Sequence, residues 1–210
     1  MAGALLPILR LISAVNAFVL RIGRNIAWVA LAFMVLAILI QVFFRYVLNN
    51  ALPWPDEAAR FLMLWMTGLI APTAFRRGGF VAIDMLVLML PERIGAIVSL
   101  LLLFISALVL YWAVIIGYGE VTGFGGKFNT AALYVPFNFG DGVCEAIGTK
   151  SAEGLWCRMP RSWMFLSLWI GVILMLVVNI ELILRSILTM LGKGEELPPI
   201  PPGEEEVMAE

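Results

Sequence analysis

Long apolar runs separated by short polar stretches dominate the pattern of the chain. Four of these runs are long enough to cross a ~30 Å hydrocarbon core, which takes about 20 residues of helix. They predict membrane-spanning helices at about residues 25–47, 57–75, 92–120 and 162–188. The pattern therefore predicts an all-α integral membrane protein whose four-helix membrane domain covers residues 25–190.

A further helical pattern precedes the first span. At helical spacing, Arg10, Ser13, Ala17, Arg21 and Arg24 share one narrow arc, and apolar side chains lie opposite. This predicts an N-terminal amphipathic helix, residues 1–24, that lies in the membrane interface with its arginines toward anionic headgroups. A signal sequence is the alternative, but Arg10 interrupts its apolar region and no small-residue cleavage site precedes a polar start.

Three segments outside the spans have distinct compositions. Residues 80–90 are apolar except for Asp84 and too short to cross, so we expect a short surface helix between spans two and three; a re-entrant segment is the alternative. Residues 121–161 contain glycines, prolines and both cysteines, which indicates a long polar loop with room for short helices. The proline- and glutamate-rich residues 191–210 predict a disordered cytoplasmic tail.

Composition supports the membrane assignment and narrows the function. The chain is 62% hydrophobic and 14% charged, whereas soluble domains are about 45–50% apolar and about 25% charged. Its net charge of −1 gives no reason to expect a nucleic-acid partner. Because the chain has no histidine, histidine-ligated metal sites, Ser-His-Asp triads and Cys-His pairs are excluded. We therefore expect no enzyme activity, no cofactor and no metal.

The distribution of basic residues predicts the orientation. Arg76 and Arg77 occupy a short connection, and the positive-inside rule then places both termini in the cytoplasm. Cys144 and Cys157 consequently lie outside, where disulfides persist. A disulfide between them would stabilise the loop by roughly 3 kcal/mol in the chain-entropy model, and two free thiols remain the alternative.

The spans indicate a helper protein rather than a carrier. Each has a stripe of small or polar residues, which lets membrane helices approach closely. No charge lies near the middle of a span, since Arg45, Glu120, Glu181 and Arg185 all lie within about two turns of an end. Ion and proton paths usually need a polar group at midplane depth or a broken helix there.

The connection between the first two spans carries a cluster of polar residues. Trp54 lies between two prolines, Asp56 and Arg60 are four residues apart, and Arg45 can meet Asp56 or Glu57 across the loop. These contacts are either a solvated pair worth under about 1 kcal/mol, or a clamp that fixes the hairpin or docks a partner. The candidate interface residues are Arg45, Trp54, Asp56, Glu57 and Arg60 on the outer side, and Arg76, Arg77 and Asp84 on the inner side.

These residues resemble a known family, the small membrane subunit of tripartite ATP-independent periplasmic (TRAP) transporters. In that family a first helix ends in Phe-x-Arg-Tyr, a Pro-Trp loop leads to an acidic pair and Ala-Arg, and an arginine–glycine motif follows the second helix. The matching residues here are Phe43, Arg45, Tyr46, Pro53, Trp54, Asp56, Glu57, Ala59, Arg60, Arg76, Arg77, Gly78, Gly79, Asp84 and Leu86. The resemblance covers about residues 25–125. The chain departs from the family at Phe80, where a histidine is usual, and in its longer loop at 123–160.

The resemblance implies a role in the bacterial inner membrane. The small subunit packs on a large membrane subunit that carries the moving transport domain, the sodium sites and the substrate. A periplasmic solute-binding protein, bound transiently, delivers an organic acid, and the small subunit enlarges the fixed scaffold. The alternatives are a four-span structural or adhesion protein and a membrane thiol oxidoreductase, and the absence of a Cys-x-x-Cys motif disfavours the latter.

Overall fold

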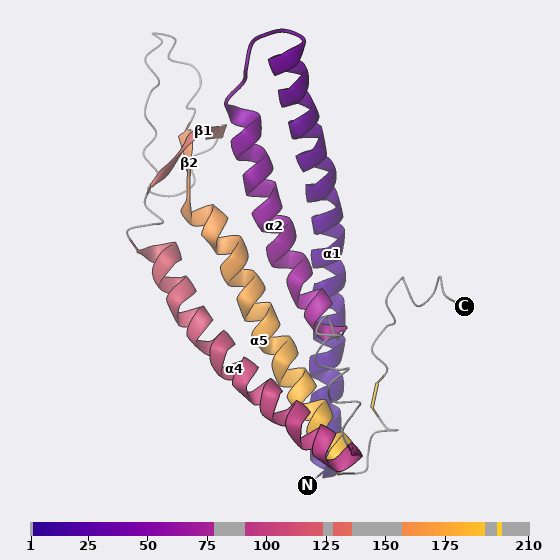
Figure 1. Cartoon of the computed structure of the whole chain (residues 1–210). Helices are drawn as coiled ribbons and strands as arrows, with labels where there is room; N and C mark the ends of the chain where they lie inside the picture. Colours follow the sequence, from indigo (N-terminus) through magenta and orange to yellow (C-terminus); the bar gives the residue numbers. More distant parts are fainter. Residues whose placement is uncertain (1, 78–90, 124–127, 136–156, 192–196, 199–210) are drawn as a thin grey trace, which may run out of the picture. The chain divides into compact units, whose positions relative to one another are not determined.

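The computed structural model describes residues 2–77, 91–123, 128–135, 157–191 and 197–198. Within these ranges, four helices are long and apolar enough to cross a membrane (Figure 1). They are α1 (Ala2–Tyr46), α2 (Trp54–Arg76), α4 (Glu92–Thr122) and α5 (Ser162–Met190). The predicted all-α membrane fold is confirmed, and the ends of α2, α4 and α5 lie close to the predicted ends of the spans.

Helix α1 is one continuous element. Its 45 residues extend about 67 Å at 1.5 Å per residue, roughly twice a ~30 Å hydrocarbon core. The predicted N-terminal helix and the first span are therefore joined without a break. Gly23 lies near the junction, and a single glycine costs a helix only about 1 kcal/mol, which does not interrupt it. The interfacial location of residues 1–24 stays a prediction.

Local chemistry explains where α1 ends and α2 begins. Asn49, in the connection after α1, has a φ of 50°, and asparagine tolerates this left-handed conformation better than most residues. Pro55 lies in the first turn of α2 together with Asp56 and Glu57, and the helix ends at Arg76. Acidic residues at the start and a basic residue at the end complement the helix dipole.

The chain divides into two compact units, of which the first contains residues 1–24, 70–114 and 171–210. Its buried core consists of Leu20 of α1, Phe75 of α2 and Val178 of α5. Helix α4 is joined to α5 by a hydrogen bond in which Asn179 Nδ2 donates to Ser106 Oγ at 3.0 Å. Parts of all four helices thus meet within this unit.

The second unit, residues 25–69 and 115–170, contains two close helix contacts at glycines. A Cβ added at Gly68 would lie 2.5 Å from the backbone oxygen of Ser167, so α2 and α5 touch through their backbones there. A Cβ at Gly117 would lie 2.8 Å from Trp169 Cδ1. Gly117 and Ser167 belong to the predicted stripes of small or polar residues, whereas Gly68 does not.

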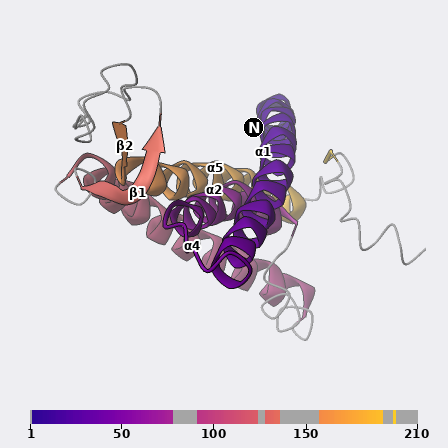
Figure 2. The same cartoon turned by 90° about the horizontal axis from the view of Figure 1, so that it is seen from above.

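The second unit also contains two strands, β1 (Asn129–Val135) and β2 (Cys157–Pro160), which pair antiparallel and lie side by side in Figure 2. Thr130 Oγ1 donates to the carbonyl of Met159 at 2.9 Å across the pair. The sequence predicts a long loop with room for short helices between residues 121 and 161, but these two segments form strands instead. Threonine, tyrosine and valine in β1 favour a strand, but its partner is distant in sequence, so the local pattern did not reveal the pairing.

Several expectations fall on other segments. The short helix at 80–90, Cys144 and most of the tail at 191–210 lie outside the described residues. The Cys144–Cys157 disulfide therefore stays a prediction.

Candidate functional site

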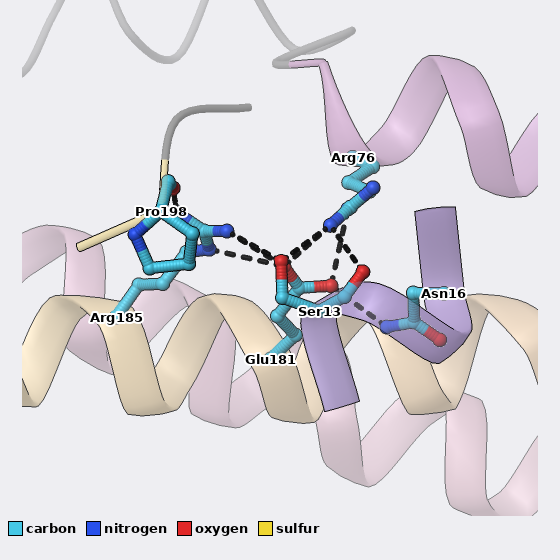
Figure 3. Close-up of polar contacts among 6 residues, drawn as sticks. All are labelled: Ser13, Asn16, Arg76, Glu181, Arg185 and Pro198. Atoms are coloured by element: carbon cyan, nitrogen blue, oxygen red, sulfur yellow. Dashed lines mark hydrogen bonds and ion pairs between the residues drawn. The ribbon is translucent and has the colours of Figure 1, made fainter. Parts of the chain in front are cut away.

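Five polar side chains from three helices meet in the interior of the first unit. This buried arginine–glutamate cluster consists of Ser13, Asn16, Arg76, Glu181 and Arg185 (Figure 3). Each of the five residues is no more than 8% exposed. Because charged side chains are almost never this buried unless they are paired, their contacts decide what the cluster does.

Helical spacing brings the members of the cluster together. Ser13 and Asn16 are three residues apart in α1, and Glu181 and Arg185 are four apart in α5, so each pair lies on one helix face. Arg76 is the last residue of α2. Figure 3 shows its side chain directed toward Glu181 and Ser13.

The Glu181 carboxylate is the centre of the cluster. Arg76 donates two hydrogen bonds to it, from Nη2 to Oε1 at 2.7 Å and from Nε to Oε2 at 3.1 Å. This two-pronged geometry is the strongest form of an arginine–carboxylate contact. Arg185 donates to Oε1 from Nη2 at 2.9 Å and from Nε at 3.1 Å, and Asn16 Nδ2 donates to Oε2 at 2.7 Å. The carboxylate thus accepts hydrogen bonds from every other member of the cluster except Ser13, and these donors come from α1, α2 and α5.

Ser13 connects the two arginines to α1. Its Oγ accepts from Nη2 of Arg76 and from Nη2 of Arg185, each at 3.0 Å. Its backbone carbonyl accepts a further bond from Nη2 of Arg76 at 3.1 Å. On the far side, Nη1 of Arg185 donates to the carbonyl of Pro198 at 2.7 Å, which fastens the chain beyond α5.

The cluster is an internal structural lock rather than an open binding site. Two guanidinium groups and one carboxylate leave it with a net charge of +1. Removing one partner of a buried ion pair typically costs about 3–5 kcal/mol, because the other charge is left uncompensated. The bonds therefore hold α1, α2 and α5 together within this unit. In the described part of the chain, no group of histidine, cysteine or acidic residues could hold a metal ion.

The predicted outer residues form a surface contact. Arg60 Nη2 lies 2.8 Å from Asp56 Oδ2, as the spacing predicts, and the side chains are 70% and 49% exposed. Such an exposed pair contributes little to stability. Arg45 lies against the ring of Tyr46, 5.8 Å from its centroid, and its pairing with Asp56 or Glu57 stays a prediction. Trp54 is partly exposed at the start of α2.

The three residues predicted on the inner side, Arg76, Arg77 and Asp84, do not form one site in the structure. Arg76 belongs to the buried cluster, Arg77 is exposed, and Asp84 lies outside the described residues. Ser13 was predicted to share one arc of the N-terminal helix with Arg10 and Arg21. Those two arginines are exposed, but Ser13 is buried because it accepts hydrogen bonds from the two arginines of the cluster.

Four members of the cluster were not among the predicted site residues: Ser13, Asn16, Glu181 and Arg185. Two signals in the sequence pointed to them. Asn16 interrupts an otherwise apolar segment, and Glu181 and Arg185 have the spacing of an intrahelical ion pair. Neither signal says which other helix supplies the partners.

The sequence was compared with known proteins. A family model described as "Tripartite ATP-independent periplasmic transporters, DctQ component" matches residues 34–189. The chain belongs to the DctQ family. The resemblance to the small membrane subunit of TRAP transporters is thus confirmed. Comparisons with curated proteins and with solved structures gave no match.

Membership in the DctQ family, with four apolar helices, makes this chain a multi-pass inner-membrane component of a transporter. The family is not known as an enzyme, and it implies association with a large DctM subunit and a binding protein. This favours a transporter component over an adhesion protein or a thiol oxidoreductase. The matched range includes Arg76, Glu181 and Arg185 but begins after Ser13 and Asn16. The charged residues of the cluster therefore lie in the region that the family model matches, whereas its two residues in α1 precede that region.

Proposed function

We propose that this DctQ component is the fixed scaffold subunit of a TRAP transporter. It supports the DctM subunit in the sodium-coupled uptake of an organic acid, which a periplasmic binding protein delivers. The observation that carries the proposal, together with the family, is the buried arginine–glutamate cluster.

The contacts of the cluster support a static role. Ionisable groups inside a membrane protein often line an ion or substrate path. Here the carboxylate of Glu181 is occupied by Arg76, Arg185 and Asn16, all of the same chain. A carboxylate that accepts so many fixed bonds would lose them if it bound a passing ion. We therefore assign it to holding helices, and we assign substrate and sodium binding to the DctM subunit.

Large apolar side chains on the helix surfaces support an assembly role. Exposed examples are Phe33 on α1 and Phe104 and Trp112 on α4. In the proposed assembly these surfaces contact lipid and the DctM subunit.

The proposed orientation has both termini in the cytoplasm. Arg76 ends α2 and Arg77 follows it, and both line a small hollow together with Arg21 and Arg24 of α1, so positive charge gathers at this end of α2. Reporter fusions at residue 210 test the orientation. A fluorescent protein at the C-terminus should be bright and alkaline phosphatase inactive, and the reverse result would contradict it.

Reconstituted uptake tests the scaffold function. Vesicles containing DctM are prepared with and without this chain, and a panel of radiolabelled organic acids is offered with the binding protein under a sodium gradient. Uptake should require both this chain and the gradient. Uptake that is unchanged without the chain would refute the scaffold role, and uptake without the gradient would refute sodium coupling.

A further inference from the structure

A small hollow lies beside the buried cluster, between α1 and the end of α2 in the first unit. It has a volume of about 70 Å³, several times what one water requires. Its lining includes four arginines and is formed by Ala17, Leu20, Arg21, Arg24, Thr73, Arg76 and Arg77.

The arginines make the hollow strongly positive. Arg76 shares the Glu181 carboxylate with Arg185, and its bonds to that carboxylate use Nε and Nη2 but not Nη1. In the part of the chain that the structure describes, neither Arg21 nor Arg24 pairs with a carboxylate. Arg77 is exposed at the rim and adds a further cation. The hollow therefore has more positive charge than the neighbouring carboxylate balances.

Thr73 provides a second, independent indication of a ligand. Its Oγ1 is buried and has no hydrogen-bond partner among the residues described. Buried hydroxyls almost always have a hydrogen-bond partner, because burial removes their hydrogen bonds to water and leaving these unreplaced costs free energy. A threonine in a helix commonly satisfies itself on the carbonyl four residues earlier, and Thr67 does so on Met63. Thr73 also lines the hollow, and we infer that its hydroxyl turns to an acceptor bound there.

The hollow also lies at a suitable depth. Helix α2 has 23 residues and extends about 34 Å, close to the thickness of a hydrocarbon core. Its last residue, Arg76, is therefore near the level of the phospholipid headgroups. Arginine binds phosphate oxygens with two parallel bonds, and basic pockets between membrane helices bind anionic headgroups.

We propose that this hollow binds a phosphate group, supplied by an anionic phospholipid headgroup or by free inorganic phosphate. Arg21, Arg24 and Arg77 neutralise it, and the Thr73 hydroxyl donates a hydrogen bond to one of its oxygens. The site does not depend on the proposed scaffold function, because it uses only groups of this chain.

Lipid retention tests the proposal. The full chain is placed in nanodiscs of phosphatidylcholine and phosphatidylglycerol and released into detergent, and native mass spectrometry measures the bound lipids. The same measurement is repeated with excess inorganic phosphate. The variants are Arg21→Gln with Arg77→Gln, and Thr73→Val. Arg10→Gln is the matched control, because Arg10 is exposed on α1 and does not line the hollow.

The unmodified chain should retain phosphatidylglycerol over phosphatidylcholine. Each arginine lost should weaken retention about fivefold, so the double variant should weaken it about 25-fold. Thr73→Val should weaken retention about threefold or more without lowering thermal stability, because it removes only an unmet hydroxyl. Arg10→Gln should have no effect. Displacement by inorganic phosphate identifies free phosphate as the ligand, and resistance to it identifies the headgroup. Equal retention of the two lipids with no effect of phosphate, or equal losses in Arg10→Gln and the double variant, would overturn the proposal.

Discussion

Replacing Glu181 with glutamine should remove both ion pairs of the buried cluster while keeping the size and shape of the side chain. The carboxylate accepts five hydrogen bonds, two at Oε2 and three at Oε1. A glutamine has one acceptor oxygen, so its NH₂ group must face donors that the carboxylate had satisfied. The variant leaves two guanidinium groups without a counter-charge, which raises the net charge of the cluster from +1 to +2.

We expect Glu181→Gln to lower the free energy of unfolding by about 3–5 kcal/mol, the usual cost of removing one partner of a buried ion pair. The assay is unfolding by SDS in mixed micelles, followed by tryptophan fluorescence. Glu120→Gln is the matched control, because Glu120 is exposed at the end of α4. Its change should stay within about 0.5 kcal/mol.

A double variant tests whether charge causes the loss. Arg185→Gln added to Glu181→Gln returns the net charge to +1 and removes one uncompensated guanidinium. It should therefore be less damaging than the sum of the single changes. If Glu181→Gln unfolds like Glu120→Gln, or if the two changes simply add, the account of the cluster as an electrostatic lock is refuted.

Three other changes test separate parts of the molecule. Gly68→Ala should cost about 1–3 kcal/mol because its Cβ would lie 2.5 Å from a backbone oxygen of the facing helix, whereas Gly119→Ala, with nothing within 4 Å, should leave the SDS midpoint unchanged or raise it. Equal midpoints for the two variants would contradict the close contact. Arg60→Ala should lower the free energy of unfolding by less than about 1 kcal/mol but weaken co-purification with DctM. Unchanged co-purification would mean that Arg60 and Asp56 are only a solvated surface pair and do not contact DctM. Cys144 and Cys157 should react with an alkylating agent only after reduction, as a mass shift shows, and free thiols in the native protein would rule out the disulfide.

The sequence predicted most of the helical framework for simple physical reasons. Apolar runs of sufficient length predict spans directly, and the acidic start and basic end of α2 marked its limits closely. The continuity of α1 was not predicted, and it is possible because nothing near residue 24 is strong enough to break a helix.

The cluster was less predictable because its bonds join residues far apart in sequence. Asn16 and Glu181 are separated by 165 positions, and Arg76 and Glu181 by 105. Helical periodicity says which residues share a face of one helix but not which helices meet. Arg76 was identified from a family motif, whereas Glu181 looked like an ordinary charge near a helix end.

The separation of the partners also matters during biosynthesis. Arg76 is made 105 residues before Glu181, which at about 5–20 residues per second leaves an interval of about 5–20 s. During that interval only α1 can offer Arg76 a partner from the cluster, through the hydroxyl and carbonyl of Ser13. The lock closes only after the last helix is inserted. A chain released before α5 is made would keep Arg76 without its counter-charge, which distinguishes an unfinished membrane protein from a finished one.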